Sequence, residues 1–144
     1  MRKVAVPSRY AIGIAIIFAA FAVPILAQEP ESVADAQEAA ERWLAQLDAG
    51  NYAGTWRDAA AVVRTVPQAQ YEATMRQVRT PLGSAADRAV KSATYQTSMP
   101  GVPDGQYVII QYTTRFANKE QAVETVIPMR EQDGTWRVSG YAVR

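Results

Sequence analysis

Apolar residues follow three successive patterns along the chain, and each pattern is typical of a different structure. The first is a continuous run: residues 11–26 contain no charged side chain, and three basic residues precede them. Cations stay on the cytoplasmic side of a membrane while an apolar helix enters the bilayer. This order predicts a signal peptide over residues 1–27, cleaved near Ala27, and a periplasmic or secreted location for the exported domain that follows.

An uncleaved anchor is the alternative interpretation of this run, because its length approaches the ~20 residues needed to span a bilayer. Pro24 near its end and its short alanine-rich centre favour cleavage. The chain contains no cysteine, which excludes a lipid attached through that residue. Contact with a membrane is therefore expected only through an N-terminal segment that is retained.

From residue 32 to residue 83 the apolar positions recur at helical spacing. Ser32, followed three places later by Asp35, predicts the capped start of a first helix, and Gly50 predicts its left-handed end. A short second helix is expected over 52–61, and Pro67 suits the first turn of a third. Two apolar stripes are expected in the core: Val33, Ala36, Ala40, Trp43, Leu44 and Leu47 on the first helix, and Tyr71, Met75, Val78 and Leu82 on the third.

Beyond residue 87 the apolar positions alternate, as they do in strands that bury one face. We expect four strands, over 87–97, 106–116, 121–130 and 135–143. Turns at Asn118-Lys119 and Asp133-Gly134 would join the last three into hairpins. Pro128 removes one donor from the ladder, so we expect a sheet edge or a bulge at that position.

Helices followed by an antiparallel meander predict a single α+β domain over residues 28–144, with the helices packed on one face of a four-stranded sheet. This order is similar to the cone-shaped fold of nuclear transport factor 2, in which a curved sheet wraps a long helix. A cystatin-like fold, with one helix on a sheet, is the alternative. Three predicted helices favour the cone.

Charge and composition exclude several classes of function. Three of the 15 Lys and Arg residues precede residue 28 and all 14 Asp and Glu residues follow it, so residues 28–144 carry 12 cations and 14 anions, a net charge of −2. Phosphate backbones require a cationic surface, so no nucleic-acid partner is expected. The chain has neither Cys nor His, which excludes thiolate nucleophiles, imidazole bases and the common zinc, haem and iron–sulfur sites. We expect no cofactor and no metal.

Several ordered motifs are specific as a set rather than singly. They are Ala40-Glu41-Arg42-Trp43-Leu44, Asp48-Ala49-Gly50-Asn51-Tyr52 with Trp56, Arg79-Thr80-Pro81-Leu82-Gly83 with Arg88, residues 100–107, Glu124-Thr125-Val126 and residues 133–141. Together they resemble a family of small exported bacterial proteins, domain of unknown function number four-thousand-nineteen, over nearly the whole domain. The resemblance implies an exported domain without an assigned activity, and it implies no catalytic residue.

Polar residues that an inward-facing cone would gather form the candidate ligand-binding set. They are Arg79, Arg88, Glu124, Tyr107, Tyr112 and Tyr141. A buried pair between Glu124 and either arginine would fix the end of the third helix against the sheet, since a guanidinium can bind a carboxylate through two hydrogen bonds. The alternatives are an anionic ligand held by both arginines and a solvent-exposed surface.

A competing function is an enzyme of the ketosteroid isomerase type, because such cones use a carboxylate base beside a tyrosine in an apolar pocket. Asp48, Asp58 or Glu124 would be that base. Asp48, however, precedes Ala49-Gly50 and is more simply a turn residue. Aromatic residues at these spacings favour a core, and as the alternative they would line a pocket for an apolar ligand: Trp43, Trp56, Trp136, Tyr52, Tyr71 and Tyr141.

These observations favour an exported, non-enzymatic module that binds a small ligand or a protein partner. The outward face of the 106–116 strand is mixed in character and would suit a homodimer; it carries Tyr107, Ile109, Gln111 and Thr113. The alternatives are an isomerase- or hydrolase-type enzyme with a cone-shaped pocket, and a membrane-anchored assembly or structural protein. A core filled by its own side chains would leave only an interaction module, whereas a cavity would support a small ligand.

Overall fold

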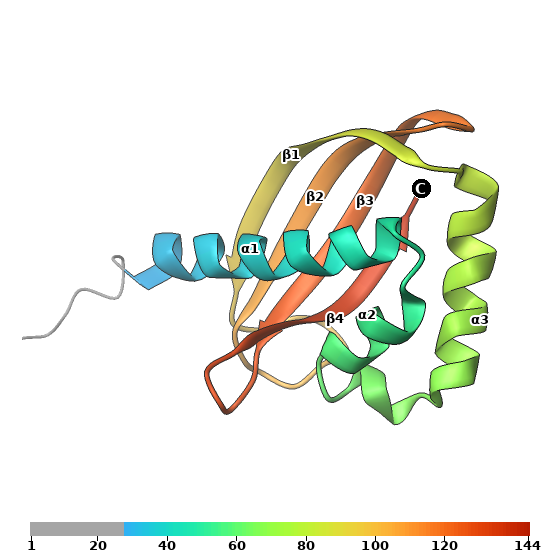
Figure 1. Cartoon of the computed structure of the whole chain (residues 1–144). Coiled ribbons are helices and arrows are strands. Elements are labelled where there is room, and N and C mark those ends of the chain that lie inside the picture. The colour runs from blue at the N-terminus through green and yellow to red at the C-terminus, as the bar shows by residue number, and fades with distance from the viewer. Residues whose placement is uncertain (1–27) are drawn as a thin grey trace, which may run out of the picture.

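The computed structural model describes residues 28–144, and its elements follow the predicted order (Figure 1). The helices come first: α1 (Gln28–Asp48), α2 (Tyr52–Asp58), the 3-10 turn η2 (Val63–Thr65), α3 (Gln68–Arg79) and the 3-10 turn η3 (Thr80–Leu82). The strands follow: β1 (Ala85–Gln96), β2 (Tyr107–Phe116), β3 (Lys119–Arg130) and β4 (Trp136–Val143). The predicted signal peptide lies outside the described residues. None of the described helices is long and apolar enough to cross a membrane.

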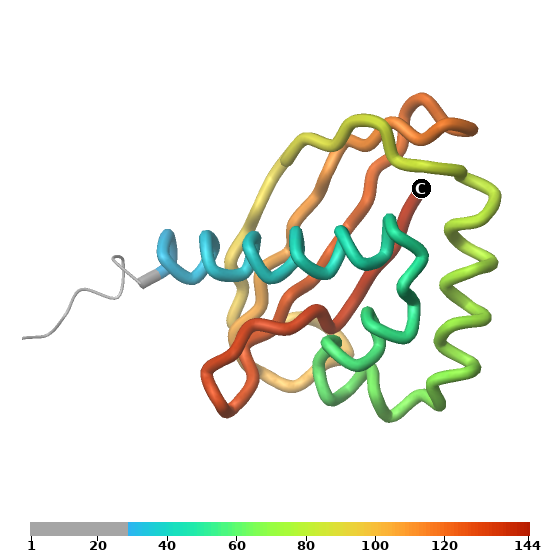
Figure 2. The backbone as a smooth tube through the Cα atoms, in the orientation of Figure 1, coloured from blue at the N-terminus to red at the C-terminus, as the bar shows by residue number. Residues whose placement is uncertain are grey.

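The four strands form one antiparallel sheet in the order β1-β2-β3-β4, so every neighbour in sequence is a neighbour in space. α1 crosses one face of this curved sheet, and α3 stands beyond the C-terminal end of α1 (Figures 1 and 2). The domain is therefore of the predicted α+β class. Three α-helices against one open sheet are consistent with the expected cone and exceed the single helix of the cystatin alternative.

α1 buries the face that its helical spacing predicts. Ala36, Ala40, Trp43, Leu44 and Leu47 are all buried there against inward-facing residues of the sheet. Removing such apolar surface from water contributes about 25 cal/mol per Å², which makes this contact the main source of stability in a chain without disulfides.

The predicted start of α1 is wrong, because the helix begins at Gln28 and Ser32 lies inside it. Pro30 falls in the first turn, where backbone N–H groups have no partner within the helix, so proline's missing N–H costs no hydrogen bond. Glu29 and Glu31 also lie in that turn, where negative charge interacts favourably with the helix dipole. The acidic segment before Ser32 is therefore part of the helix.

A tight turn ends α1 and starts α2. Gly50 has the predicted left-handed backbone, with φ of 73°. The Asn51 side chain then caps α2 by accepting a hydrogen bond of 3.0 Å from the Gly54 N–H. α2 ends at Asp58, before its predicted end, and Trp56 is only half-buried rather than a core residue. Thr55 occupies the fully buried position instead.

A β-bulge in the β3–β4 pair occurs where Pro128 predicts one. Ile127 pairs with Gly140 but Pro128 pairs with Val138, so Ser139 is an extra residue on β4. The Ser139 hydroxyl donates to the Ile127 carbonyl oxygen at 2.8 Å. The extra residue reverses the alternation along β4, so that Tyr141 lies on the same inner face as Val138.

Candidate functional site

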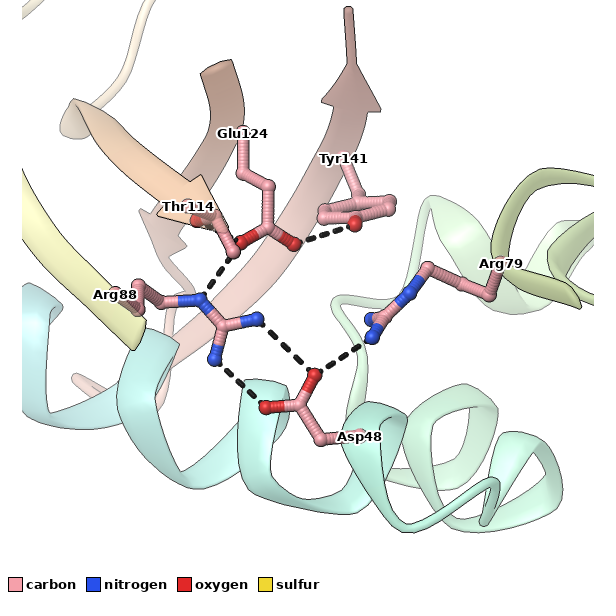
Figure 3. Close-up of polar contacts among 6 residues, drawn as sticks. All are labelled: Asp48, Arg79, Arg88, Thr114, Glu124 and Tyr141. Atoms are coloured by element: carbon pink, nitrogen blue, oxygen red, sulfur yellow. Dashed lines mark hydrogen bonds and ion pairs between the residues drawn. The ribbon is translucent and has the colours of Figure 1, made fainter. Parts of the chain in front are cut away.

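Polar side chains from six different elements meet at the C-terminal end of α1 (Figure 3). We call this group the polar cluster. Its members are Asp48 of α1, Arg79 of α3, Arg88 of β1, Thr114 of β2, Glu124 of β3 and Tyr141 of β4. Residues separated by up to 93 positions in sequence thus come together because the meander brings the four strands side by side under α1.

Glu124 is the centre of the polar cluster and is completely buried, with 0% of its side chain exposed. Its Oε2 accepts hydrogen bonds from Arg88 Nε at 2.6 Å and from the Thr114 hydroxyl at 2.5 Å. Its Oε1 accepts a hydrogen bond of 2.6 Å from the Tyr141 hydroxyl. A buried carboxylate is strongly destabilising without partners, and here three donors, one of them the cation Arg88, replace the lost water.

Asp48 joins both arginines at the edge of the polar cluster. Arg88 binds it through two hydrogen bonds, NH1 to Oδ2 at 2.7 Å and NH2 to Oδ1 at 3.0 Å. Arg79 NH2 donates to Oδ1 at 2.7 Å. The cluster therefore contains two guanidinium groups and two carboxylates, so its charges balance without a ligand.

The pKa values in the polar cluster follow from burial and these partners. Burial alone would raise the pKa of Asp48, but the hydrogen bonds and charges of Arg88 and Arg79 outweigh it and hold that pKa below its ordinary value. Burial and the negative charge of Glu124 raise the pKa of Tyr141. Asp48 is thus held as a carboxylate, and Tyr141 is held as a protonated hydrogen-bond donor.

Two side chains, Arg79 of the polar cluster and Tyr112 on the inner face of the sheet, have buried polar atoms without partners among residues 28–144. Arg79 is 5% exposed, and its guanidinium carbon lies 5.1 Å from the centre of the Phe116 ring. Its Nε and NH1 are buried and have no hydrogen-bond acceptor within the described part of the chain. The Tyr112 hydroxyl is likewise buried and unpaired there, and burial raises the pKa of Tyr112 to about 12.

The structure brings together most of the candidate set from the sequence. The predicted pair between Arg88 and Glu124 is present, whereas Arg79 pairs with Asp48 rather than with Glu124. Tyr141 joins the polar cluster, and Tyr112 shares its face of the sheet. Tyr107 lies apart from it: its hydroxyl donates to the Pro103 carbonyl oxygen at 2.7 Å.

Two members of the polar cluster were absent from the candidate ligand-binding set. Asp48 was considered as a catalytic base and then interpreted as a turn residue; it does end α1, but its carboxylate binds two arginines, which was not predicted. Thr114 was not predicted as a site residue. A hydroxyl on a buried face needs a hydrogen-bond partner, which could have indicated a polar site at Thr114. In the structure Thr114 lies opposite Arg88 in the β1–β2 register.

An apolar pocket of about 320 Å³ opens beside the polar cluster, between α3 and β4. We call it the α3–β4 pocket. It is lined by Trp43, Ala59, Val62, Val63, Val66, Tyr71, Met75, Val138, Ser139, Gly140 and Tyr141. Three of the six aromatic residues expected to form a core or line a pocket are therefore at this pocket, and Trp56, Trp136 and Tyr52 are not in its lining.

The polar side chains in the lining of the α3–β4 pocket are hydrogen-bonded to protein groups. Trp43 Nε1 donates to the Thr55 carbonyl oxygen at 3.0 Å, and the Tyr71 hydroxyl donates to the Thr55 hydroxyl oxygen at 3.1 Å. The Tyr141 hydroxyl is engaged by Glu124, as described above. The rings thus present apolar faces to the pocket, with the Tyr141 and Trp43 rings 5.4 Å apart between centres.

A second, larger pocket of about 1060 Å³ adjoins the first. It lies between the β1–β2 loop and the β3–β4 hairpin and shares Val62, Ser139 and Gly140 with the α3–β4 pocket. The exposed large apolar side chains among the described residues are Val62, Val66, Val90 and Val102, and all except Val90 line one of these pockets. Gathered apolar exposure of this kind is typical of an interaction site.

Comparison with known proteins gives one match. The family model described as protein of unknown function (DUF4019) covers residues 39–141. The chain belongs to this family. The matched region of the DUF4019 domain contains the whole polar cluster and the whole lining of the α3–β4 pocket. No curated protein and no solved structure matches the chain. In the part of the DUF4019 domain that the structure describes, no three acidic residues are grouped as they would be to hold a metal ion.

Proposed function

We propose that this protein is a non-enzymatic binding domain that takes an apolar group into the α3–β4 pocket, and that it does so outside the cytoplasm. The observation that carries the binding proposal is an open apolar pocket whose polar side chains are already hydrogen-bonded to the protein. The order of basic and apolar residues in 1–27 supports export.

The chemistry of the polar cluster supports binding over catalysis. A general base works best with a pKa near the working pH, and burial or like charges usually raise a carboxylate into that range. Arg88 and Arg79 do the opposite to Asp48, whose pKa they lower. Glu124 accepts hydrogen bonds from three donors and is completely buried. These carboxylates are better explained as a clamp that holds α1, α3 and the sheet together.

The shape of the α3–β4 pocket supports a ligand with an apolar part of modest size. A volume of about 320 Å³ lies at the lower end of the range of ligand sites. Val66 is 37% exposed and Val62 is 57% exposed, so a ligand would also cover apolar surface that water now contacts. Each Å² of that surface removed from water would contribute about 25 cal/mol.

The test uses N-phenyl-1-naphthylamine, a neutral apolar probe whose fluorescence rises when it leaves water. We expect saturable binding to the wild-type protein and none, or binding weaker by about tenfold, to Val66→Trp, which places a large side chain in the lining. Val90→Trp is the matched control, because Val90 is also exposed but lies on β1, away from the pocket. Equal binding to all three proteins, or none to the wild type, would contradict the proposal.

A further inference from the structure

β4 forms one edge of the sheet, and its outward hydrogen-bonding groups near the C-terminus are free in the structure of residues 28–144. Val123 and Arg144 exchange two backbone hydrogen bonds, of 2.8 and 3.1 Å. Directly bonded pairs alternate with unbonded ones in an antiparallel ladder, so Val143 and Tyr141, opposite Glu124 and Val126, are in unbonded pairs. Their N–H and C=O groups therefore point away from β3, toward the open edge.

The protein itself covers this edge at one point upstream of the bulge. Ala60, just after α2, donates its backbone N–H to the Val138 carbonyl oxygen at 2.9 Å. Beyond the bulge, the outward groups of Tyr141 and Val143 have no hydrogen-bond partner within the described part of the chain. At the opposite edge, β1 carries two register shifts, one of them at Lys91, and such irregularity discourages strand pairing. The free segment of β4 is regular by contrast.

This free segment borders the α3–β4 pocket at Tyr141. Val138 to Tyr141 form one wall of the pocket, and Tyr71 and Met75 of α3 lie across it. The C-terminal end of β4 lies on the side of the sheet that faces α3 (Figure 1). A strand added to this edge would lie about 4.8 Å from β4, with every second side chain on the inner face where the pocket opens.

The helices that border the pocket are basic, although the domain as a whole is slightly acidic. Residues 52–79 contain Arg57, Arg64, Arg76 and Arg79 against Asp58 and Glu72. Arg57 and Arg64 are exposed, and neither forms an ion pair with a carboxylate in the described region. Arg64, next to the pocket residue Val63, donates to the Arg57 carbonyl oxygen at 3.0 Å, which holds the Arg64 guanidinium beside the backbone of Arg57. Acidic groups would be attracted there.

We infer that the edge of β4 at Tyr141 and Val143 binds an extended peptide by strand addition. The peptide has an apolar side chain, which enters the α3–β4 pocket, and acidic residues on either side of it. Backbone pairing would supply affinity, and the pocket and the arginines would supply selectivity. This inference rests on the proposed function, because it uses the same pocket, and it names the class of ligand.

The probe is a set of five acetylated and amidated peptides, Glu-Glu-Thr-X-Thr-Glu-Glu, in which X is Val, Leu, Ile, Met or Phe. Exchange of the Tyr141 and Val143 amide hydrogens is followed by NMR. We expect at least one peptide to slow both amides by about tenfold or more at saturation. Two versions of that peptide, N-methylated at odd or at even positions, separate pairing from simple apolar contact. One version should lose binding and the other should keep it, because only every second N–H group of the peptide would face β4.

Two variants of the protein complete the test. Val143→Pro removes one outward N–H, which a sheet edge tolerates, and Val143→Ala removes similar side-chain volume but keeps that N–H. We expect peptide binding to be lost in Val143→Pro and retained in Val143→Ala, with the naphthylamine probe bound by both. Its binding by Val143→Pro also shows that this variant is folded.

Distinct results overturn the two proposals. Naphthylamine binding without protection of Tyr141 and Val143 by any of the five peptides would overturn strand addition and leave the apolar pocket standing. Equal effects of the two N-methylated versions would also overturn it. Protection of these amides that rises with protein concentration alone would assign the edge to a second copy of the chain instead of a peptide partner. Absence of naphthylamine binding in the wild type would overturn the proposed function itself.

Discussion

The hydroxyl of Tyr141 is hydrogen-bonded within the polar cluster, whereas its ring forms part of the wall of an open apolar pocket. On the hydroxyl side, two arginines and two carboxylates neutralise one another, and Glu124 has three donors. On the ring side, Trp43 and Met75 border a volume that the protein does not fill. Most charges and hydrogen-bonding groups of the polar cluster are paired with one another. The apolar surface of the pocket, by contrast, remains open to a ligand.

This difference separates what holds the domain together from what is available to a ligand. Charges in the polar cluster connect α1 and α3 to the sheet, so removing one charge would leave its partner buried and unpaired. Pocket residues make mainly apolar contacts. A substitution there changes the volume of the pocket and leaves no buried charge unpaired. Variants of the first kind should therefore act on stability, and variants of the second kind on binding.

The largest effect is expected for Glu124→Gln. Loss of the carboxylate removes the ion pair with Arg88 at 2.6 Å and places an amide N–H₂ among hydrogen-bond donors, which should lower the free energy of unfolding by about 3 kcal/mol. Chemical denaturation measures the change. Glu120→Gln, an exposed position on the same strand, is the control and should change stability by less than about 0.5 kcal/mol. A stable Glu124→Gln variant that binds anions more tightly would instead assign the arginines to an anionic ligand.

A smaller effect, dependent on pH, is expected for Asp48→Asn. Because Arg88 and Arg79 lower the pKa of Asp48 in the folded protein, its contribution to stability is present above its ordinary pKa of 3.8 and is lost as the pH falls through the lowered value. The variant should lose about 2 kcal/mol at neutral pH and show a flatter decline of stability in acid. Denaturation between pH 2 and pH 7 tests this, with Asp104→Asn as the control. Parallel pH profiles for wild type and variant would contradict it.

The smallest effect, and the sharpest test of the comparison, is expected for Tyr141→Phe. This change removes the hydrogen bond to Glu124 but keeps the ring in the pocket wall, so stability should fall by about 1 kcal/mol while naphthylamine binding stays unchanged. Above pH 10 the difference should shrink, because the raised pKa of Tyr141 means that the wild type loses stability as the pH rises past the ordinary value of 10.0. Tyr95→Phe is the control. Weaker probe binding by Tyr141→Phe would show that the two sides are not separable.

Periodicity was enough to predict the fold because most elements have one clear face. The stripe on α1 and the alternation on β2 each place apolar residues in the core, and the structure buries them as expected except for Val33, which is half-buried. The boundaries of β3 and β4 differ from the prediction by no more than two residues. The start of α1 was missed because acidic residues and Pro30 suit a linker and a first helical turn equally well.

The site was less predictable, because its geometry depends on long-range register. The pair of Arg88 and Glu124 could be proposed from residue type and strand alternation. The choice of Asp48 as partner of Arg79 could not, since it requires the end of α1 to lie beside the end of α3. Asp48 before Gly50 has the local pattern of a turn, and local pattern says nothing about a partner 31 positions away. The apolar pocket likewise depends on which aromatic rings the helices leave unpacked.

The single additional residue at Ser139 has a consequence for how this domain can vary in length. Val138 before it and Tyr141 after it both point inward. They do so because the three residue steps from Val138 to Tyr141 on β4 lie opposite only two steps on β3. Deleting one residue there would turn the Tyr141 side chain out to solvent. The hydrogen bond to Glu124 and the ring's place in the pocket wall would then be lost together. Surface loops such as 97–106 can gain or lose residues with little effect, but this strand has to keep its count.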